Sequence, residues 1–229
     1  LAIHYGVTFV LSTATQPALG SFQSFGNKPF RGLDHVHEII DDPDKLYRQL
    51  ERVKVSVPAD FQTPCDWESL SDELLTHPSV LCVVGRRDDA RELHRLMMAN
   101  ENGKYTLHLS ALMCGEHRSR IIRYIKWRLK KNKPLRVIST QLVEAGVDVD
   151  FPVVYRAVAG LDSIAQAAGR CNREGKLNEL GKVIVFVPPK PAPAGMLRQA
   201  AQITVSLLTG NTTNVLHREL AKTFFEHLY

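Results

Sequence analysis

The stretch from residue 135 to residue 173, LRVISTQLVEAGVDVDFPVVYRAVAGLDSIAQAAGRCNR, decides the fold. Residues 135–139 and 153–158 are nearly continuous apolar runs, which is typical of strands that are covered on both faces. A short helix is predicted at residues 141–145 and a longer one at residues 162–172. Because strands and helices alternate in this way, the segment predicts parallel βαβ units.

The same alternation continues on both sides of this stretch. Further strands are predicted at residues 7–11, 38–40, 53–57, 80–84, 105–109 and 183–187. Further helices are predicted at residues 43–51, 66–76, 88–99, 115–131, 196–208 and 214–228. The chain is therefore expected to be an α/β protein, with a parallel sheet between two layers of helices.

Composition limits the class of protein without naming a function. The chain has 229 residues, 44% of them hydrophobic, and its 29 Lys and Arg against 24 Asp and Glu give a net charge of +5. This mild excess permits a polyanionic partner and does not require one. The four cysteines have no C-x-x-C spacing, so we expect free thiols in a cytoplasmic protein and no metal site. No apolar run approaches the ~18 residues of a membrane helix.

The first candidate site is Q-x-x-G-R-x-x-R, formed by Gln166, Gly169, Arg170 and Arg173 on the predicted helix 162–172. Arg170 and Arg173 are three residues apart, so on a helix they share a face. Two converging guanidinium groups suit the oxygens of a phosphoryl group in transfer. The alternative is a solvated arginine pair on a surface helix.

The second candidate site follows the strand at residues 135–139. The hydroxyl and amide groups of Ser139 and Thr140 could hold a phosphate of a nucleic-acid backbone. Gly146 permits a tight turn that presents Asp148, whose carboxylate could accept a hydrogen bond from a ribose hydroxyl, with Asp150 as a neighbouring candidate. Ordinary turn chemistry is the alternative.

Together these two segments resemble motifs V and VI of superfamily 2 helicases, and in particular the CRISPR-associated helicase–nucleases that degrade DNA in type I systems. STATQP at residues 12–17 resembles motif III of that family, residues 80–97 resemble motif IV, and HLSALMCGEHR at residues 108–118 resembles motif IVa. The resemblance covers residues 6–17 and 80–188.

The resemblance implies a RecA-like helicase lobe of three αβα layers, with a strand of the preceding lobe at its N-terminus and helices at its C-terminus. Residues 1–31 would be the end of the first RecA-like lobe and a linker, residues 32–190 the second lobe, and residues 191–229 a helical extension.

It also implies roles at the ATP site. Arg170 and Arg173 would contact the ATP γ-phosphate, with Arg173 as the arginine finger. Gln166 would position the nucleotide or its attacking water, and Gly146 and Asp148 would lie near the ribose.

The remaining roles concern nucleic acid. The residues implied to contact its backbone are Ser110, Arg118, Ser139 and Thr140. Thr13 and Thr15 would couple the nucleotide state to strand movement. The partners implied are single-stranded DNA and, in CRISPR interference, a guide-RNA surveillance complex.

Three helicase and nuclease signatures do not occur in the sequence. There is no G-x-x-x-x-G-K-[S/T] loop, no D-E-x-H or D-E-A-D tetrapeptide to hold Mg²⁺, and no adjacent His-Asp pair. We therefore expect a parent protein whose first lobe holds most of the Mg²⁺ contacts and which also carries a nuclease domain. The chain alone is expected not to hydrolyse ATP. Two alternatives stay open: another superfamily 2 motor in DNA repair or RNA remodelling, and a non-catalytic binding module.

The helix predicted at residues 115–131 is strongly basic. Its apolar stripe is Ile121, Ile122, Ile125 and Leu129, and Arg123, Lys126, Lys130 and Lys133 are expected on the exposed face. This face is either a solvated surface or a sequence-independent phosphate track. Trp67 and Trp127 are predicted to pack within their helices and not to serve as base-stacking platforms.

Overall fold

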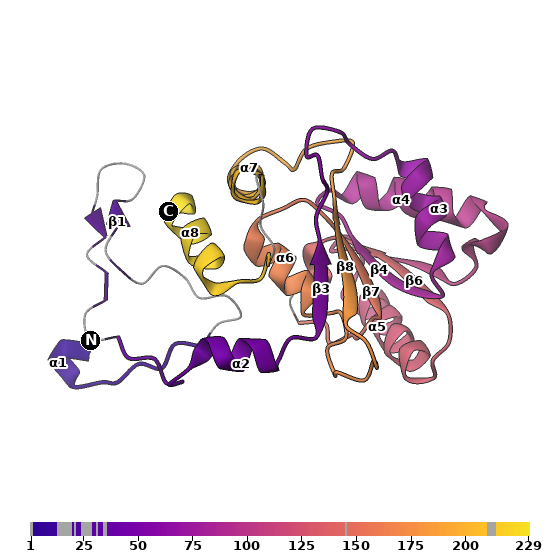
Figure 1. Cartoon of the computed structure of the whole chain (residues 1–229). Helices are drawn as coiled ribbons and strands as arrows, with labels where there is room; N and C mark the ends of the chain where they lie inside the picture. Colours follow the sequence, from indigo (N-terminus) through magenta and orange to yellow (C-terminus); the bar gives the residue numbers. More distant parts are fainter. Residues whose placement is uncertain are drawn as a thin grey trace.

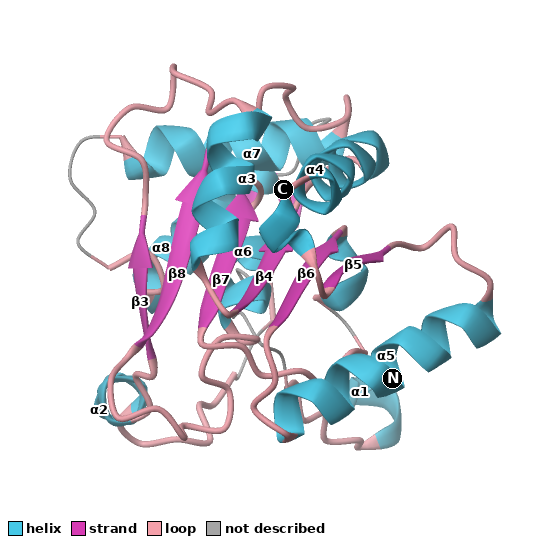
Figure 2. Ribbon diagram, turned by 90° about the vertical axis from the view of Figure 1, so that its right-hand side faces the viewer, coloured by secondary structure: helices cyan, strands magenta, loops and turns pink. Residues whose placement is uncertain are grey.

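The computed structural model describes residues 2–12, 20, 22–23, 29–30, 32–33, 36–144, 146–209 and 214–229. A six-stranded sheet has the order β3-β8-β7-β4-β6-β5, and all its neighbouring strands are parallel (Figure 2). Its strands are β3 (Val53–Ser56), β4 (Ser79–Val83), β5 (Thr106–Leu109), β6 (Leu135–Ser139), β7 (Val153–Ala157) and β8 (Gly181–Phe186). The sheet confirms the predicted parallel α/β class.

Helices connect the strands. They are α1 (Ala2–Tyr5), α2 (Pro43–Gln49), α3 (Trp67–Thr76), α4 (Arg87–Ala99), α5 (Gly115–Lys130), α6 (Leu161–Ala168), α7 (Met196–Leu208) and α8 (Arg218–Leu228). Two 3₁₀ turns, η1 (Glu101–Gly103) and η2 (Gln141–Val143), precede β5 and follow β6. A small antiparallel hairpin joins β1 (Phe22–Gln23) to β2 (Pro29–Phe30). In Figure 1 this hairpin and α1 lie apart from the six-stranded sheet.

Helices cover both faces of the sheet, and successive residues of each strand point to opposite faces. On β4, Val80 and Cys82 pack against α3 and α4, while Leu81 and Val83 pack with the buried side chains of α5 and α6. The strands are therefore mostly apolar, as the sequence pattern indicated, and the protein has three αβα layers.

The C-terminal helices pack on this lobe. Phe224 of α8 is fully buried, in a cluster that includes Ile164 of α6 and Ala200 of α7. A Cβ placed on Gly160, immediately before α6, would lie 3.2 Å from Cζ of Phe224. α7 and α8 thus form part of the support of α6, which carries Gln166. Among the described residues, none of the helices combines the length and the apolar character that a bilayer crossing requires.

Two short predicted strands are not observed. Residues 7–12 have no regular secondary structure, with Val10 and Leu11 exposed, and residues 38–40 form no strand. A strand needs a neighbouring strand to satisfy its backbone hydrogen bonds, and neither segment has one here. Thr13 and Thr15 lie outside the described residues.

Candidate functional site

The helix that carries Gln166 ends earlier than predicted. α6 stops at Ala168, with Gly169 as its C-terminal cap, so Arg170 and Arg173 lie in the turn beyond it and do not share a helical face. The backbone of Phe151 pairs with this turn: its N–H donates to the Arg170 carbonyl at 2.9 Å, and its carbonyl accepts from the Asn172 N–H at 2.9 Å. Pairing with Phe151 replaces the helical continuation that the sequence predicted.

Arg170 is bound to the backbone that follows β6. Its Nε donates to the carbonyl of Val143 at 2.9 Å, and its Nη2 donates to the carbonyl of Glu144 at 2.5 Å. Burial lowers the pKa of this guanidinium, and the nearby charge of Arg173 lowers it further. In this structure Arg170 therefore joins the Q-x-x-G-R-x-x-R segment to the segment at residues 139–150.

Arg173 meets the same segment through two carboxylates. Its Nε lies 2.8 Å from Oδ1 of Asp148, and its backbone N–H donates to Oδ1 of Asp150 at 2.7 Å. The backbone N–H of Glu174 donates to the other oxygen of Asp150 at 3.3 Å. Asp150 thus orders the turn, while the Arg173 side chain stays 44% exposed and the Asp148 side chain 67% exposed. This pair faces solvent, where a ligand can reach it.

The turn is also bonded to Arg52, the residue before β3. Asn172 is buried in a left-handed conformation, with φ 43°, and its Nδ2 donates to the Arg52 carbonyl at 3.0 Å. The Arg52 guanidinium in turn donates to the Arg173 carbonyl. Sequence reasoning missed Asn172 and Arg52. The only signal available was the turn propensity of asparagine inside the Q-x-x-G-R-x-x-R segment.

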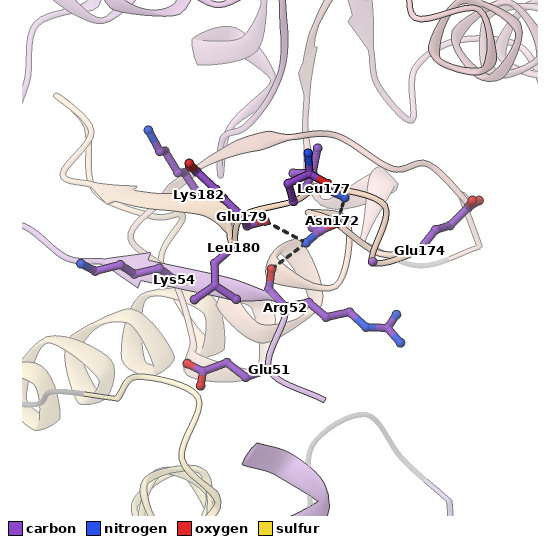
Figure 3. Close-up of a pocket in the computed structure, with 11 residues that line it drawn as sticks. Glu51, Arg52, Lys54, Asn172, Glu174, Leu177, Glu179, Leu180 and Lys182 are labelled. Atoms are coloured by element: carbon purple, nitrogen blue, oxygen red, sulfur yellow. Dashed lines mark hydrogen bonds between the residues drawn. The ribbon is translucent and has the colours of Figure 1, made fainter. Parts of the chain in front are cut away.

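An open hollow of about 770 Å³ lies beside this turn (Figure 3). Its walls combine acidic and basic side chains, including Glu51, Lys54, Glu174 and Lys182. None of the residues predicted to contact ATP lines it. Because its charges are mixed, the hollow gives no preference for an anionic or a cationic ligand.

A buried ion pair lies beneath the two segments, and the sequence reading did not anticipate it. Nη2 of Arg156 on β7 is 2.9 Å from Oε1 of Glu144, and their side chains are 0% and 5% exposed. The contact lacks the angles of a good hydrogen bond, and Nε of Arg156 has no partner among the described residues. Burial raises the pKa of Glu144, against the opposing effects of Arg156 and the Ser163 hydroxyl. A charged residue inside a strand otherwise apolar was the available signal.

The other predicted ATP residues flank this junction. Gly146 has a φ of +72°, which favours glycine, so the predicted tight turn before Asp148 is present. Gln166 is half-buried on α6. At this junction the Arg173 side chain contacts Asp148 directly, and Arg170 binds backbone carbonyls of the same segment.

The predicted nucleic-acid residues lie at the carboxyl ends of two neighbouring strands. Ser110 follows β5 and Thr140 follows β6, and the Thr140 N–H donates to the Leu109 carbonyl at 3.3 Å. Both side chains are buried. The Ser139 hydroxyl donates to the Thr140 carbonyl at 2.9 Å and so is already engaged. Arg118 lies in the first turn of α5, half-buried.

No metal centre is formed by the described residues, because no three His, Cys, Asp or Glu side chains come together in a suitable group. The four cysteines are free thiols.

A three-layer fold with a fully parallel sheet is the RecA-like α/β fold, and the segments that resemble motifs V and VI meet at one junction in it. Residues 76–176 match the family model described as the C-terminal region of the CRISPR-associated nuclease/helicase Cas3. The matched residues hold most of the six-stranded sheet, so this part of the chain is similar in sequence and in fold to the helicase lobe of Cas3 proteins.

Individual proteins show the same similarity. The CRISPR-associated nuclease/helicase Cas3 of Haloferax volcanii is 52% identical over 59 residues, which is 25% of this chain and 6% of that protein. The crystal structure of T. fusca Cas3 with ADP matches 87% of this chain and 26% of that chain, with a TM-score of 0.60 and 17% identity. A CRISPR RNA-guided surveillance complex before nicking contains a chain with a TM-score of 0.57 and 14% identity, covering 77% of this chain and 25% of that one. The chain thus spans about a quarter or less of the length of these relatives.

Proposed function

We propose that this chain is the C-terminal motor lobe of an ATP-dependent single-stranded DNA translocase. In this proposal the lobe closes on a first RecA-like lobe each time ATP binds between them. The observation that carries it is the junction of motifs V and VI, where Arg173 and Asp148 lie 2.8 Å apart on an exposed surface. A cation and an acceptor side by side suit a phosphate and a ribose of one nucleotide.

The two arginines have different tasks in the proposal. Arg173 is the arginine finger, because its side chain is exposed and its backbone is bonded to Asp150 and to Arg52. Arg170 has two of its donor nitrogens on the carbonyls of Val143 and Glu144, so it acts chiefly as a positioning residue for motif V. Gln166 orients the nucleotide or its attacking water.

ATP is the substrate, and Mg²⁺ would supply Lewis-acid stabilisation of the transferring phosphoryl group. We propose that the first lobe holds the metal for the most part. The residues of this chain contribute positive charge at the γ-phosphate and an acceptor at the ribose, and closure of the lobes would exclude bulk water other than the attacking molecule.

Single-stranded DNA would bind along the carboxyl ends of β5 and β6. Thr140 and Ser110 lie there on neighbouring strands, and hydroxyl groups can bind phosphates without regard to base sequence. Arg118 adds a positive charge at the start of α5. Ser139 is kept as a proposed contact; in this structure its hydroxyl donates to the Thr140 carbonyl and its carbonyl accepts from the Val84 N–H. Thr13 and Thr15 are kept as the proposed coupling residues.

At the level of the whole protein, we propose that the motor feeds DNA to a nuclease domain in CRISPR interference. A guide-RNA surveillance complex would deliver the displaced strand. The match to a chain in such a complex is at the level of the fold, and it motivates this partner.

The test is ATP hydrolysis by the full-length protein and by this chain alone. The full-length protein should hydrolyse ATP faster with single-stranded DNA than with RNA of the same sequence, and the chain alone should show no turnover. Stimulation by RNA alone would favour an RNA motor, because the 2′-hydroxyl would then be part of recognition. Turnover by the chain alone would refute its role as one half of an ATP site.

A further inference from the structure

Three aromatic side chains are exposed together on the surface formed by the second half of α5 and the residue before β5. Tyr105, Tyr124 and Trp127 are 40%, 39% and 45% exposed. As predicted, Trp67 packs: it is 5% exposed and lies edge-on against Phe186. Trp127 packs on Tyr124 of its own helix but keeps 45% of its surface exposed. We call this surface the aromatic–lysine patch, and its residues are Tyr105, Tyr124, Trp127, Lys126, Lys130, Lys131 and Lys133.

A buried guanidinium holds these rings in place. Arg128 donates from Nε and Nη2 to the Pro134 carbonyl, at 3.0 and 2.7 Å, and from Nη1 to the Tyr124 hydroxyl at 2.9 Å. Its guanidinium carbon lies 3.8 Å from the centre of the Tyr105 ring. The rings of Tyr124 and Trp127 are stacked, with centroids 5.9 Å apart and planes 26° from parallel. The patch is therefore ordered before any partner arrives, which reduces the entropy lost on binding.

The backbone conformation of Tyr105 also indicates a binding site. Its φ of +70° is a left-handed conformation, which is unfavourable for an aromatic residue with a Cβ. The Tyr105 carbonyl accepts from the Arg136 N–H at 3.1 Å, and this bond together with the Arg128 guanidinium keeps the ring at the surface. Backbone strain of this kind tends to persist at binding sites.

The charge of the patch is uncompensated. In the first half of α5, Glu116 pairs with Arg120 at 2.9 Å and lies 3.9 Å from Arg123. In the part of the chain that the structure describes, no carboxylate lies within 4.0 Å of the patch lysines. The ammonium of Lys133 lies 4.6 Å from the centre of the Trp127 ring, so a positive charge lies directly beside an aromatic face.

We propose that the aromatic–lysine patch is a second binding site for single-stranded nucleic acid, with lysines on the phosphates and bases stacked on Trp127 and Tyr124. Positive charge interleaved with exposed rings is the chemistry of sequence-independent single-strand binding. The inference rests on the proposed function for the presence of such a strand. An acidic protein would match the charge, but it would leave the ordered rings without a role.

The patch is separate from the contacts proposed at the carboxyl ends of the strands. Tyr105 precedes β5 and Ser110 follows it, so the two ends are about 16 Å apart at the usual rise of a strand. A DNA strand bound at both places would run along β5, which lies at one edge of the sheet in Figure 2. The lobe would then bind the same DNA strand at two places.

The test uses this chain with Trp67→Phe, which leaves Trp127 as its one tryptophan, since the sequence has two. Oligothymidine should quench the Trp127 emission, and a fluorescein-labelled copy measured by anisotropy gives the affinity. Trp127→Ala in the otherwise unchanged chain should weaken binding about tenfold, as expected for one lost stacking contact. Lys126→Ala with Lys130→Ala should reduce the slope of log K against log salt by about 1.4, at about 0.7 for each lost phosphate contact.

The matched control is Lys45→Ala with Lys222→Ala, two exposed lysines on α2 and α8, which should leave both measurements unchanged. If oligothymidine binds without quenching Trp127, and the double lysine variant has the salt slope of the unmodified chain, the proposal for the patch is wrong. Binding would then be assigned to the contacts at the strand ends. If polyglutamate quenches Trp127 and oligothymidine does not, the patch belongs to an acidic protein and the proposal is wrong. If anisotropy detects no oligothymidine binding, both this inference and the proposed nucleic-acid function fail.

Discussion

The buried ion pair between Arg156 and Glu144 gives a sharp prediction about stability. Their charged atoms lie 2.9 Å apart with side chains 0% and 5% exposed. At an effective dielectric constant of about 20, the Coulomb attraction at this distance is about 6 kcal/mol, and desolvation of both groups offsets much of it. Removing one partner leaves the other buried and uncompensated. Arg156→Met should therefore lower the free energy of unfolding by about 3–5 kcal/mol.

The assay is guanidinium unfolding of the chain followed by circular dichroism. Arg156→Met combined with Glu144→Leu should recover stability to within about 1 kcal/mol of the unmodified chain, or exceed it, because neither charge is then buried. This double variant keeps the test decisive if the single variant does not fold. Arg120→Met is the matched control: its pair with Glu116 has the same 2.9 Å distance but is largely exposed, so it should change little.

The same variant should acquire a pH dependence. Burial already raises the pKa of Glu144, and loss of Arg156 removes the main influence that lowers it. The folded variant then retains a proton that the unfolded chain has released, so stability falls as pH rises through the raised folded pKa. The loss in free energy of unfolding that Arg156→Met causes should thus be smaller near pH 5 than near pH 8. An unfolding midpoint equal to that of Arg120→Met at both pH values would refute the account of this pair.

Three further substitutions test the packing around motif VI by denaturant unfolding. Asp150→Ala removes the acceptor for two backbone N–H groups at the Arg173 turn, so stability should fall by about 1–2 kcal/mol; an unchanged midpoint would show that the turn is held without it. Gly160→Ala brings a methyl group close to the Asp162 carboxylate, which must move, and to 3.1 and 3.2 Å from Cβ of Ala200 and Cζ of Phe224, so it should cost about 1–3 kcal/mol, whereas Gly115→Ala, which meets no atom within 4 Å, should cost less. Phe224→Ala leaves a cavity and should cost about 3–5 kcal/mol, and a cost below about 1 kcal/mol would mean that α8 does not support α6.

The sheet could be predicted because its strands are buried on both faces. An apolar run such as residues 80–84 is hard to place anywhere else, and Asp66 marks the start of α3, where its side chain accepts from the Ser69 N–H at 2.7 Å. The end of α6 could not be predicted in the same way. Gly169, its C-terminal cap, is a stop signal in the sequence, but the course of residues 170–173 depends on their pairing with Phe151, which the local sequence does not show.

The candidate site was predictable in its residue types and not in their geometry. The positions of Arg170 and Arg173 follow from the motif, but their different partners depend on how residues 143–150 fold against α6. The exposure of Trp127 depends on Arg128, which occupies the buried position beside it. Side chains that are fixed by distant parts of the chain have no signature in local periodicity.

The most direct test of the motor-lobe proposal is the rate of DNA-stimulated ATP hydrolysis by the full-length protein carrying Arg173→Ala, compared with Arg120→Ala as an exposed arginine outside the junction. The account predicts that Arg173→Ala lowers kcat by roughly 10³-fold, while ATP binding is retained and Arg120→Ala stays near the unmodified rate. Unchanged turnover in Arg173→Ala would contradict its assignment as the arginine finger.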